Sequence, residues 1–167
     1  MADGFVFPAN DQTNGCELWF TDGTAAGTML LKDIRTGSDG SQPRNFFALS
    51  DGRLVFQAQD ATFGQELWVT DGTVTGTTLL KDIATGASGG YPNSSSPVNF
   101  TALPDGRLVF HAFDYTYGTE LWVTDGTANG TTLVKDINPN SISGSPYGSN
   151  PSRFAPLADG RLVFQAE

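Results

Sequence analysis

An eight-residue segment occurs three times in this chain and limits its possible folds more than any other feature. Glu-Leu-Trp-Val-Thr-Asp-Gly-Thr occupies residues 66–73 and 120–127, and residues 17–24 differ from it only by Phe20 in place of valine. The tryptophans of the three copies are 49 and 54 positions apart. A segment that returns at this interval indicates a structural repeat, so the chain should fold as a series of similar units.

The similarity extends to both sides of the octapeptide. Asp-Gly-Arg-Leu-Val-Phe-x-Ala fills residues 51–58, 105–112 and 159–166, and Gly-Thr-x-Leu-(Leu/Val)-Lys-Asp-Ile fills residues 27–34, 76–83 and 130–137. The units differ in length mainly in the segments that join one unit to the next, residues 35–44, 84–97 and 138–151. A length difference confined to one connection predicts a surface loop, because packed strands do not absorb insertions.

Each complete unit contains four strand-like segments. In the third unit they cover residues 98–103, 107–112, 120–124 and 131–137, with Asp-Gly turns between them and a connection at residues 113–118. Valine, threonine and aromatic residues alternate in them without a helical period. Four short antiparallel strands joined by tight turns are typical of a β-propeller blade, so the sequence predicts an all-β propeller of four-stranded antiparallel blades.

The recurring large and acidic residues have structural interpretations. Trp19, Trp68 and Trp122 should pack between neighbouring blades, although stacking on a ligand is the alternative. Two acidic positions also recur in every copy, and we expect their carboxylates to cap turns by hydrogen bonds to the backbone. These residues are Glu17, Glu66 and Glu120, and Asp22, Asp71 and Asp125.

The motif Glu-Leu-Trp-x-x-Asp-Gly-Thr resembles the bacterial tandem-repeat family named for it (ELWxxDGT), and the order of segments is similar to TolB-like propeller blades. The resemblance covers essentially the whole chain. It implies a propeller and an extracellular or cell-surface setting in a bacterial parent protein. The family brings no established catalytic residues to these positions.

The domain organisation predicted from the repeats is a single array. Residues 1–49 form a unit without its first strand, residues 50–103 and 104–157 form complete units, and residues 158–167 add a second-strand copy. Three blades are too few to close a ring and would expose apolar faces at both ends. We therefore expect a homodimer with a twofold axis and a six-bladed ring, and a nine-bladed trimer is the alternative.

The predicted dimer contains one second strand too many at each junction. Residues 4–7 and residues 161–166 both match that strand. We expect the C-terminal copy to fill the position, because Pro8 in the N-terminal copy has no backbone N–H to donate. The other outcome that we consider is that the N-terminal copy moves to the sheet edge.

Composition excludes several classes of partner. The net charge is −9 and the isoelectric point is about 4.3, so nucleic acids and anionic membranes are not expected to bind. The single cysteine, Cys16, cannot form an internal disulfide. The sequence contains neither an apolar run of transmembrane length nor a signal peptide, so we expect a soluble chain.

A ligand site is predicted on the face formed by the connections between the second and third strands and by those that join the units. These segments are rich in Ser, Asn, Gly and Tyr, which suits a neutral polar ligand such as a glycan, although turn formation alone favours the same residues. The candidate ligand-binding residues are Asp60, Tyr91, Asn93, Asp114, Tyr115, Tyr117, Tyr147 and Asn150. Asp11, Asp60 and Asp114 recur in Asp-x-Thr-x-Gly, but Ca²⁺ requires more oxygen ligands than this motif supplies, so we expect no cofactor.

Catalysis is not indicated by the sequence. His111 is the only histidine, and glutamine occupies its place at positions 57 and 165. No pairing with Cys16 follows from the spacing, and nearly identical repeats offer equal sites instead of the different roles that a catalytic centre needs. We therefore expect a non-catalytic binding or scaffold module. The alternatives are a structural or engineered self-assembling repeat protein without a ligand and, third, a hydrolase.

Overall fold

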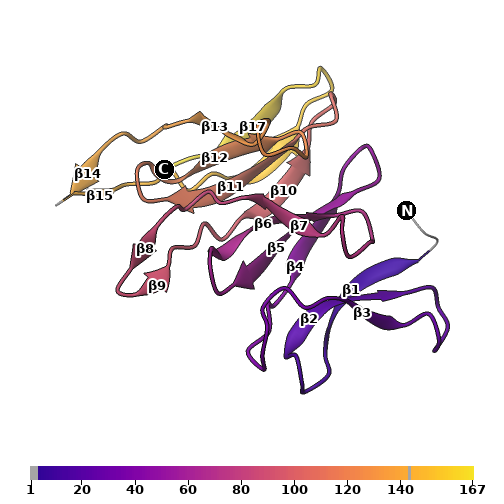
Figure 1. The fold of residues 1–167 in the computed structure, drawn as a ribbon. Coiled ribbons are helices and arrows are strands. Elements are labelled where there is room, and N and C mark those ends of the chain that lie inside the picture. Colours follow the sequence, from indigo (N-terminus) through magenta and orange to yellow (C-terminus); the bar gives the residue numbers. More distant parts are fainter. Residues whose placement is uncertain (1–3, 143) are drawn as a thin grey trace.

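The computed structural model describes residues 4–142 and 144–167, which form an all-β chain of antiparallel sheets (Figure 1). The first sheet contains β1 (Phe5–Asn10), β2 (Cys16–Thr21) and β3 (Met29–Lys32). The second contains β4 (Arg44–Ala48), β5 (Leu54–Asp60), β6 (Gly64–Thr70) and β7 (Thr78–Lys81). The third contains β10 (Val98–Ala102), β11 (Leu108–Asp114), β12 (Gly118–Thr124) and β13 (Thr132–Lys135). A hairpin of β16 (Ser152–Pro156) and β17 (Leu162–Gln165) follows.

The three sheets share one strand order and one register. In each, neighbouring strands in the sheet are also neighbours in the chain. The tryptophan of the third strand lies opposite a phenylalanine of the second, as in the pair of Phe56 with Trp68. Phe7 lies opposite Trp19 in the same way, so β1 occupies the place of a second strand beside β2. The predicted all-β architecture of repeated antiparallel sheets is confirmed, whereas the sheets do not close into a ring within the described residues.

The second and third strands are longer than the sequence predicted. β11 extends to Asp114 and β12 begins at Gly118, so half of the expected connection at residues 113–118 belongs to the strands. Gly118 has a φ of 77°, which a residue with a side chain rarely adopts. This glycine permits a turn of only three residues and lets strand pairing continue almost to the tip of the hairpin.

The two longer connections between sheets contain short hairpins where the sequence predicted loops. β8 (Ala87–Ser88) pairs with β9 (Tyr91–Pro92), and β14 (Ser141–Ile142) pairs with β15 (Ser145–Pro146). The turn of the first hairpin is Gly89-Gly90, with φ angles of 61° and 85°. Two successive positive φ angles produce the turn that matches the twist of paired strands, so Gly-Gly explains why this loop folds back on itself.

The core lies between neighbouring sheets. Trp68, from the second sheet, packs with Leu18 and Leu31 of the first, and Trp122, from the third, packs with residues of the second in a separate cluster. Both rings are only 7% exposed. Burial of an indole ring removes on the order of 200 Å² from water. The predicted packing role of these two tryptophans is confirmed, and it holds successive sheets face to face.

The first strands lie at a common edge of the array. β10 contacts both β4 and β16, which belong to the preceding sheet and the following hairpin. Each first strand has its register shift next to a residue of positive φ, at Asn45, Asn99 and Arg153. Such an extra residue bends a strand away from a flat pairing. Within the described part of the chain, no helix is long and apolar enough to cross a membrane.

Candidate functional site

Each sheet buries one glutamate at the start of the strand that carries its tryptophan. Glu66 Oε1 accepts a hydrogen bond from Ser95 N–H (2.9 Å), and Oε2 accepts from Ile83 N–H (3.0 Å) and from the Ser95 hydroxyl (2.5 Å). Glu17 and Glu120 make corresponding bonds. The predicted capping of local turns is wrong for these residues, since the partners of Glu66 lie 17 and 29 residues away. The carboxylates attach the connection between sheets to the third strand.

Burial changes the acidity of Glu66. Removal from water raises the pKa of Glu66 to about 7, and the hydrogen bonds from Ser95 and Ile83 oppose this rise. All of these donors come from the chain itself. The two oxygens of this carboxylate are therefore engaged in holding the backbone.

The second set of recurring carboxylates caps turns, as the sequence predicted. Asp71 Oδ1 accepts hydrogen bonds from the Thr73 N–H (2.9 Å) and hydroxyl (2.7 Å). Asp22 and Asp125 accept the same pair of bonds from their own turns. These bonds lower the pKa of all three aspartates, because they favour the ionised form.

Two aspartates of the predicted ligand site also cap turns. Asp60 Oδ1 accepts from the N–H groups of Thr62 (2.8 Å) and Phe63 (2.6 Å), and Asp114 makes the equivalent bonds in the third sheet. Asp11 does the same in the first sheet. Among residues 4–142 and 144–167, no group of three or more His, Cys, Asp or Glu side chains could hold a metal ion.

The connections between sheets pack against these turns. A Cβ on Gly64 would meet the carbonyl oxygen of Asn93, and one on Gly118 would meet the backbone of Tyr147. The Asn150 N–H donates to the Thr119 carbonyl (3.1 Å). The structure therefore places Asn93 next to the turn of Asp60 in the second sheet, and Tyr147 and Asn150 next to the turn of Asp114, Tyr115 and Tyr117 in the third. Tyr91 lies on the β8–β9 hairpin of the connection.

The side chains within these groups differ in their accessibility. Asn93 is buried, and its Nδ2 donates to the Thr85 carbonyl (2.8 Å). Tyr91 is 77% exposed, and Tyr147 is also exposed. The Tyr115 ring packs edge-on against Phe113 at 4.9 Å between centroids. The four tyrosines and Asn150 are thus the exposed members of the predicted site.

The groups considered for catalysis lie in different sheets. His111 is in β11, and its Nδ1 lies 2.8 Å from the Pro151 carbonyl oxygen. Cys16 begins β2, opposite Asn10. His111 lies opposite a leucine of the third strand, as Gln57 does in the second sheet, which confirms that these two positions are equivalent.

An apolar cavity of about 350 Å³ opens on the face of the third sheet next to the last hairpin. It is lined by Leu103, Val109, Leu121, Val134, Leu162 and Phe164, among others. The matching face of the second sheet is covered by the third sheet, where Val55, Leu67 and Leu80 are buried. The cavity therefore lies where the third and fourth strands of a further sheet would pack beside β17.

Within the described part of the chain, no hydrophobic cluster covers the complementary face of the first sheet. Its Phe7 and Trp19 correspond to Phe56 and Trp68, which pack against the preceding sheet. Phe5, on the same strand as Phe7, is 76% exposed. The open faces of the third and first sheets thus correspond to the two surfaces that pack against each other between the first and second sheets and between the second and third.

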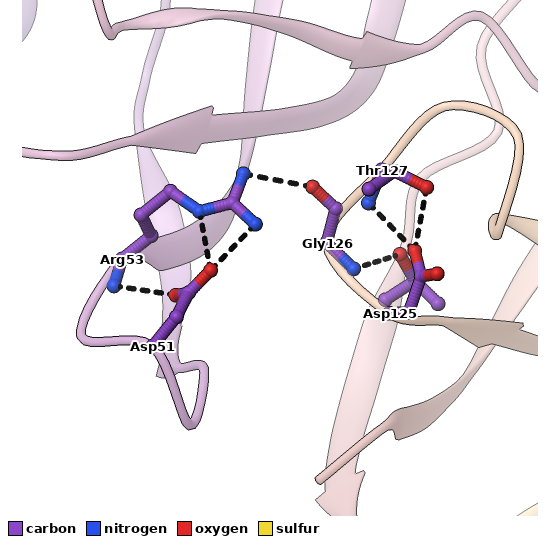
Figure 2. A network of polar contacts seen from close by, with 6 residues as sticks. Asp51, Arg53, Asp125, Gly126 and Thr127 are labelled. Atoms are coloured by element: carbon purple, nitrogen blue, oxygen red, sulfur yellow. Dashed lines mark hydrogen bonds and ion pairs between the residues drawn. The ribbon is translucent and has the colours of Figure 1, made fainter.

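Polar contacts accompany each contact between sheets. Arg53, held by Asp51, donates from Nη1 to the Gly126 carbonyl in the third sheet (2.8 Å; Figure 2). Lys32 Nζ donates to the Val74 carbonyl and Lys81 Nζ to the Ala128 carbonyl, each at 3.4 Å. Arginine and lysine side chains of one sheet therefore hold the Asp-Gly-Thr hairpin loop of the next.

Sequence reasoning missed the partners of the buried glutamates, although a signal is present. Ser-x-Pro occurs in every connection between sheets, at residues 41–43, 95–97 and 149–151. In all three copies its serine donates to the glutamate from both the backbone N–H and the hydroxyl. A recurring polar residue in an otherwise variable connection indicates a specific contact, and the pairing with glutamate needed the tertiary structure.

Comparison with known proteins adds little. No protein-family model and no curated protein matches the chain. A solved structure described as "putative exo-beta-1,3-galactanase from Bifidobacterium bifidum s17" aligns with 95% of this chain and 56% of its own, at 17% identity and a TM-score of 0.40. The chain thus spans little more than half of that protein, and a similarity this low identifies neither a shared fold nor a shared activity. Membership of the ELWxxDGT repeat family stays a prediction.

Proposed function

We propose that this chain is a non-catalytic scaffold module that associates with a second copy to complete a six-bladed β-propeller. The open face of the third sheet carries the proposal, because it is apolar and repeats a surface that is buried elsewhere in the chain. Each copy would cover this face with the first sheet of the other. A twofold arrangement satisfies both junctions with the same contact.

The polar contacts support the same pairing. Arg53 and Lys81 of the second sheet hold the loop of the third, and their counterparts in the third sheet are Arg107 and Lys135. In the ring, these two side chains would donate to the carbonyls of the partner's Gly23 and the partner's Ala25. Hydrogen-bond donors aligned with acceptors in this way favour one register over others at an apolar interface.

The mass of the chain in solution tests the proposal. We expect about twice the 17.7 kDa of one chain in sedimentation or light scattering at micromolar concentration. Val134→Asp should raise the dissociation constant at least about 100-fold, because a carboxylate would be buried among apolar side chains. Ile142→Asp changes a similarly exposed residue outside the open face and should leave the mass unchanged. A monomer at all concentrations would exclude the ring.

The absence of catalysis is part of the proposal and rests on the recurring carboxylates. Glu66 and Asp71 accept hydrogen bonds from their own backbone, and their equivalents in other sheets do the same. Groups engaged in this way are poorly placed to act on a substrate. A panel of ester and glycoside substrates should show no turnover. Turnover by the natural chain that disappears in a folded Glu66 variant would contradict the assignment as a non-catalytic module.

Glycan binding is a second candidate, supported by the exposed tyrosines beside the turns. Tyr91 and Tyr147 stand on corresponding connections of two sheets, so a ring would repeat them around one face. Exposed aromatic rings next to amide and hydroxyl groups suit the stacking and hydrogen bonding of sugars. A glycan array with the assembled protein should give signals that Tyr91→Ala weakens, and a blank array would remove this candidate.

A further inference from the structure

We propose that the sheet at each junction is composite, with β16 and β17 of one copy pairing with β2 and β3 of the other while β1 leaves its place. The inference rests on the proposed ring and assigns the segments that form its two junctions. Without such an exchange, two second strands would compete for one position. The described structure shows both competitors in place, β1 beside β2 and β17 beside β16.

β17 is seated as a second strand should be. The Glu167 N–H, just after β17, donates to the Ser149 carbonyl (2.7 Å). The equivalent bonds in the complete sheets, from the N–H of Gln59 in β5 to the Ser41 carbonyl and from the N–H of Phe113 in β11 to the Ser95 carbonyl, are both 2.8 Å long. β17 thus makes the same hydrogen bond to the connecting segment as the second strands of the complete sheets. Its edge opposite β16 can pair with a third strand.

β1 is less suited to the middle of a four-stranded sheet. It carries Pro8, which lies opposite Leu18 and has no N–H to donate. In β5 the corresponding residue is Gln57, a buried side chain whose Oε1 accepts hydrogen bonds from Arg44 and Asn45 of the first strand. Proline offers no such acceptor to β16.

The turn that precedes the second strand also favours β17. Arg161 corresponds to Arg53 and makes the same ion pair with its own aspartate, Asp159. In a composite sheet, Arg161 would donate to the carbonyl of the partner's Gly72, as Arg53 does to Gly126. The corresponding residue before β1 is Gly4, where a Cβ would overlap the Phe20 ring. Only β17 can therefore supply the arginine contact to the following sheet.

The composite sheet has a defined register. Phe113 lies opposite Thr119 in the third sheet and Gln59 lies opposite Gln65 in the second. By the same pairing, Glu167 would lie opposite Cys16 of the partner subunit. In the chain by itself, Asn10 of β1 lies opposite Cys16. The neighbour of this cysteine therefore distinguishes the two arrangements.

Disulfide trapping tests the register with the native cysteine. Directly opposite residues of antiparallel strands have Cα atoms about 4.5–5.5 Å apart, which is within the range of a disulfide. Glu167→Cys should form a covalent dimer on a non-reducing gel. Burial raises the pKa of the Cys16 thiol, so the oxidation is run at alkaline pH with a catalyst. The control Ala166→Cys places the new thiol on the other face of the strand and should yield little covalent dimer.

A third variant reports on the displaced strand. Asn10→Cys should close a disulfide with Cys16 inside one chain if β1 keeps its place, and it should retain free thiols if β1 has left. Sedimentation of the reduced proteins measures the ring separately. A dimer in which Glu167→Cys gives no covalent product and Asn10→Cys closes within the chain would overturn the composite sheet and leave the ring intact. A monomeric chain would overturn both proposals.

Discussion

At the scale of single residues, the repeats use acidic side chains in two opposite ways. Asp71 and its equivalents cap turns near the surface, where their hydrogen bonds lower the pKa of the carboxyl groups. Glu66 binds the backbone from a fully buried position, and burial raises its pKa. The same chemical group thus stabilises the folded chain over different ranges of pH, depending on whether water reaches it.

A pH dependence of stability follows for Glu66. Its pKa is about 7 in the folded chain against 4.5 for an exposed glutamate, so between these values the folded chain holds a proton that the unfolded chain releases. The resulting stabilisation, about 3 kcal/mol, is complete below the unfolded pKa and is lost as the pH rises through the folded pKa. Urea unfolding at pH 5 and pH 8 measures the change.

Glu66→Gln is the matched variant for this experiment because it cannot ionise. Its free energy of unfolding should lack the decline between pH 5 and pH 8 that Glu66 causes in the natural chain. Measurements above pH 4.5 avoid the range in which the turn-capping aspartates take up protons. Parallel curves for the two proteins would show that Glu66 is not the titrating group.

At the scale of elements, the docking of each connection on a turn determines where the next sheet begins. The buried glutamates hold this connection from one side, and the glycine that ends each short turn lets it approach closely from the other. Gly64 has a φ of 73° and contacts Asn93. Gly52 has a φ of 88° but faces open space. Both glycines thus need a positive φ, but only Gly64 also needs to be small for close packing, so substitutions at the two positions distinguish these effects.

Alanine at these two glycines should have unequal effects. Gly52→Ala should cost about 1–2 kcal/mol, the strain of a side chain at positive φ. Gly64→Ala should cost at least about 2 kcal/mol more, because the connection at Asn93 must also move away. Chemical unfolding of both variants measures the difference. Equal losses would mean that the connection yields freely and does not place the next sheet.

At the scale of the whole molecule, identical tryptophans meet different surroundings. Trp68 is covered by Leu18 and Leu31 of the first sheet, whereas Trp19 lies in the first sheet of the described residues and is half-buried. In the proposed ring, Trp19 would contact the partner's Leu121 and the partner's Val134. Repeated sequence therefore produces the same side chain in two roles, one in the core of a chain and one at the contact between chains.

Substitution of the two rings should separate folding from association. Trp68→Ala should lower the free energy of unfolding by about 3–5 kcal/mol, as expected for a large cavity in a core. Trp19→Ala should affect the isolated chain less and should raise the dimer dissociation constant at least about 100-fold, as is typical of a central interface aromatic. Sedimentation and unfolding at low concentration measure both effects. An unchanged dimer in Trp19→Ala would contradict the proposed contact.

Much of the fold follows from the repeated sequence alone. The alternation of apolar residues, the Asp-Gly turns and the recurrence of the octapeptide predicted antiparallel strands, their order and the packing of Trp68 and Trp122, because these depend on neighbours close in sequence or on repetition. The Gly89-Gly90 hairpin could also have been predicted from its turn residues. The candidate ligand site stays a prediction, and the structure shows that Asp60 and Asp114 each use one carboxylate oxygen to cap a turn.

Only the tertiary structure decided which distant groups meet. Glu66 and Ser95, or Arg53 and Gly126, come together because the sheets stack at one distance and angle, and a local pattern does not encode that geometry. The same stacking leaves the faces of Val134 and Trp19 uncovered at opposite ends of the array. Sequence periodicity determined the unit that repeats, whereas the packing between units determined the surfaces left for another chain, because hydrophobic burial depends on the three-dimensional neighbours of a residue.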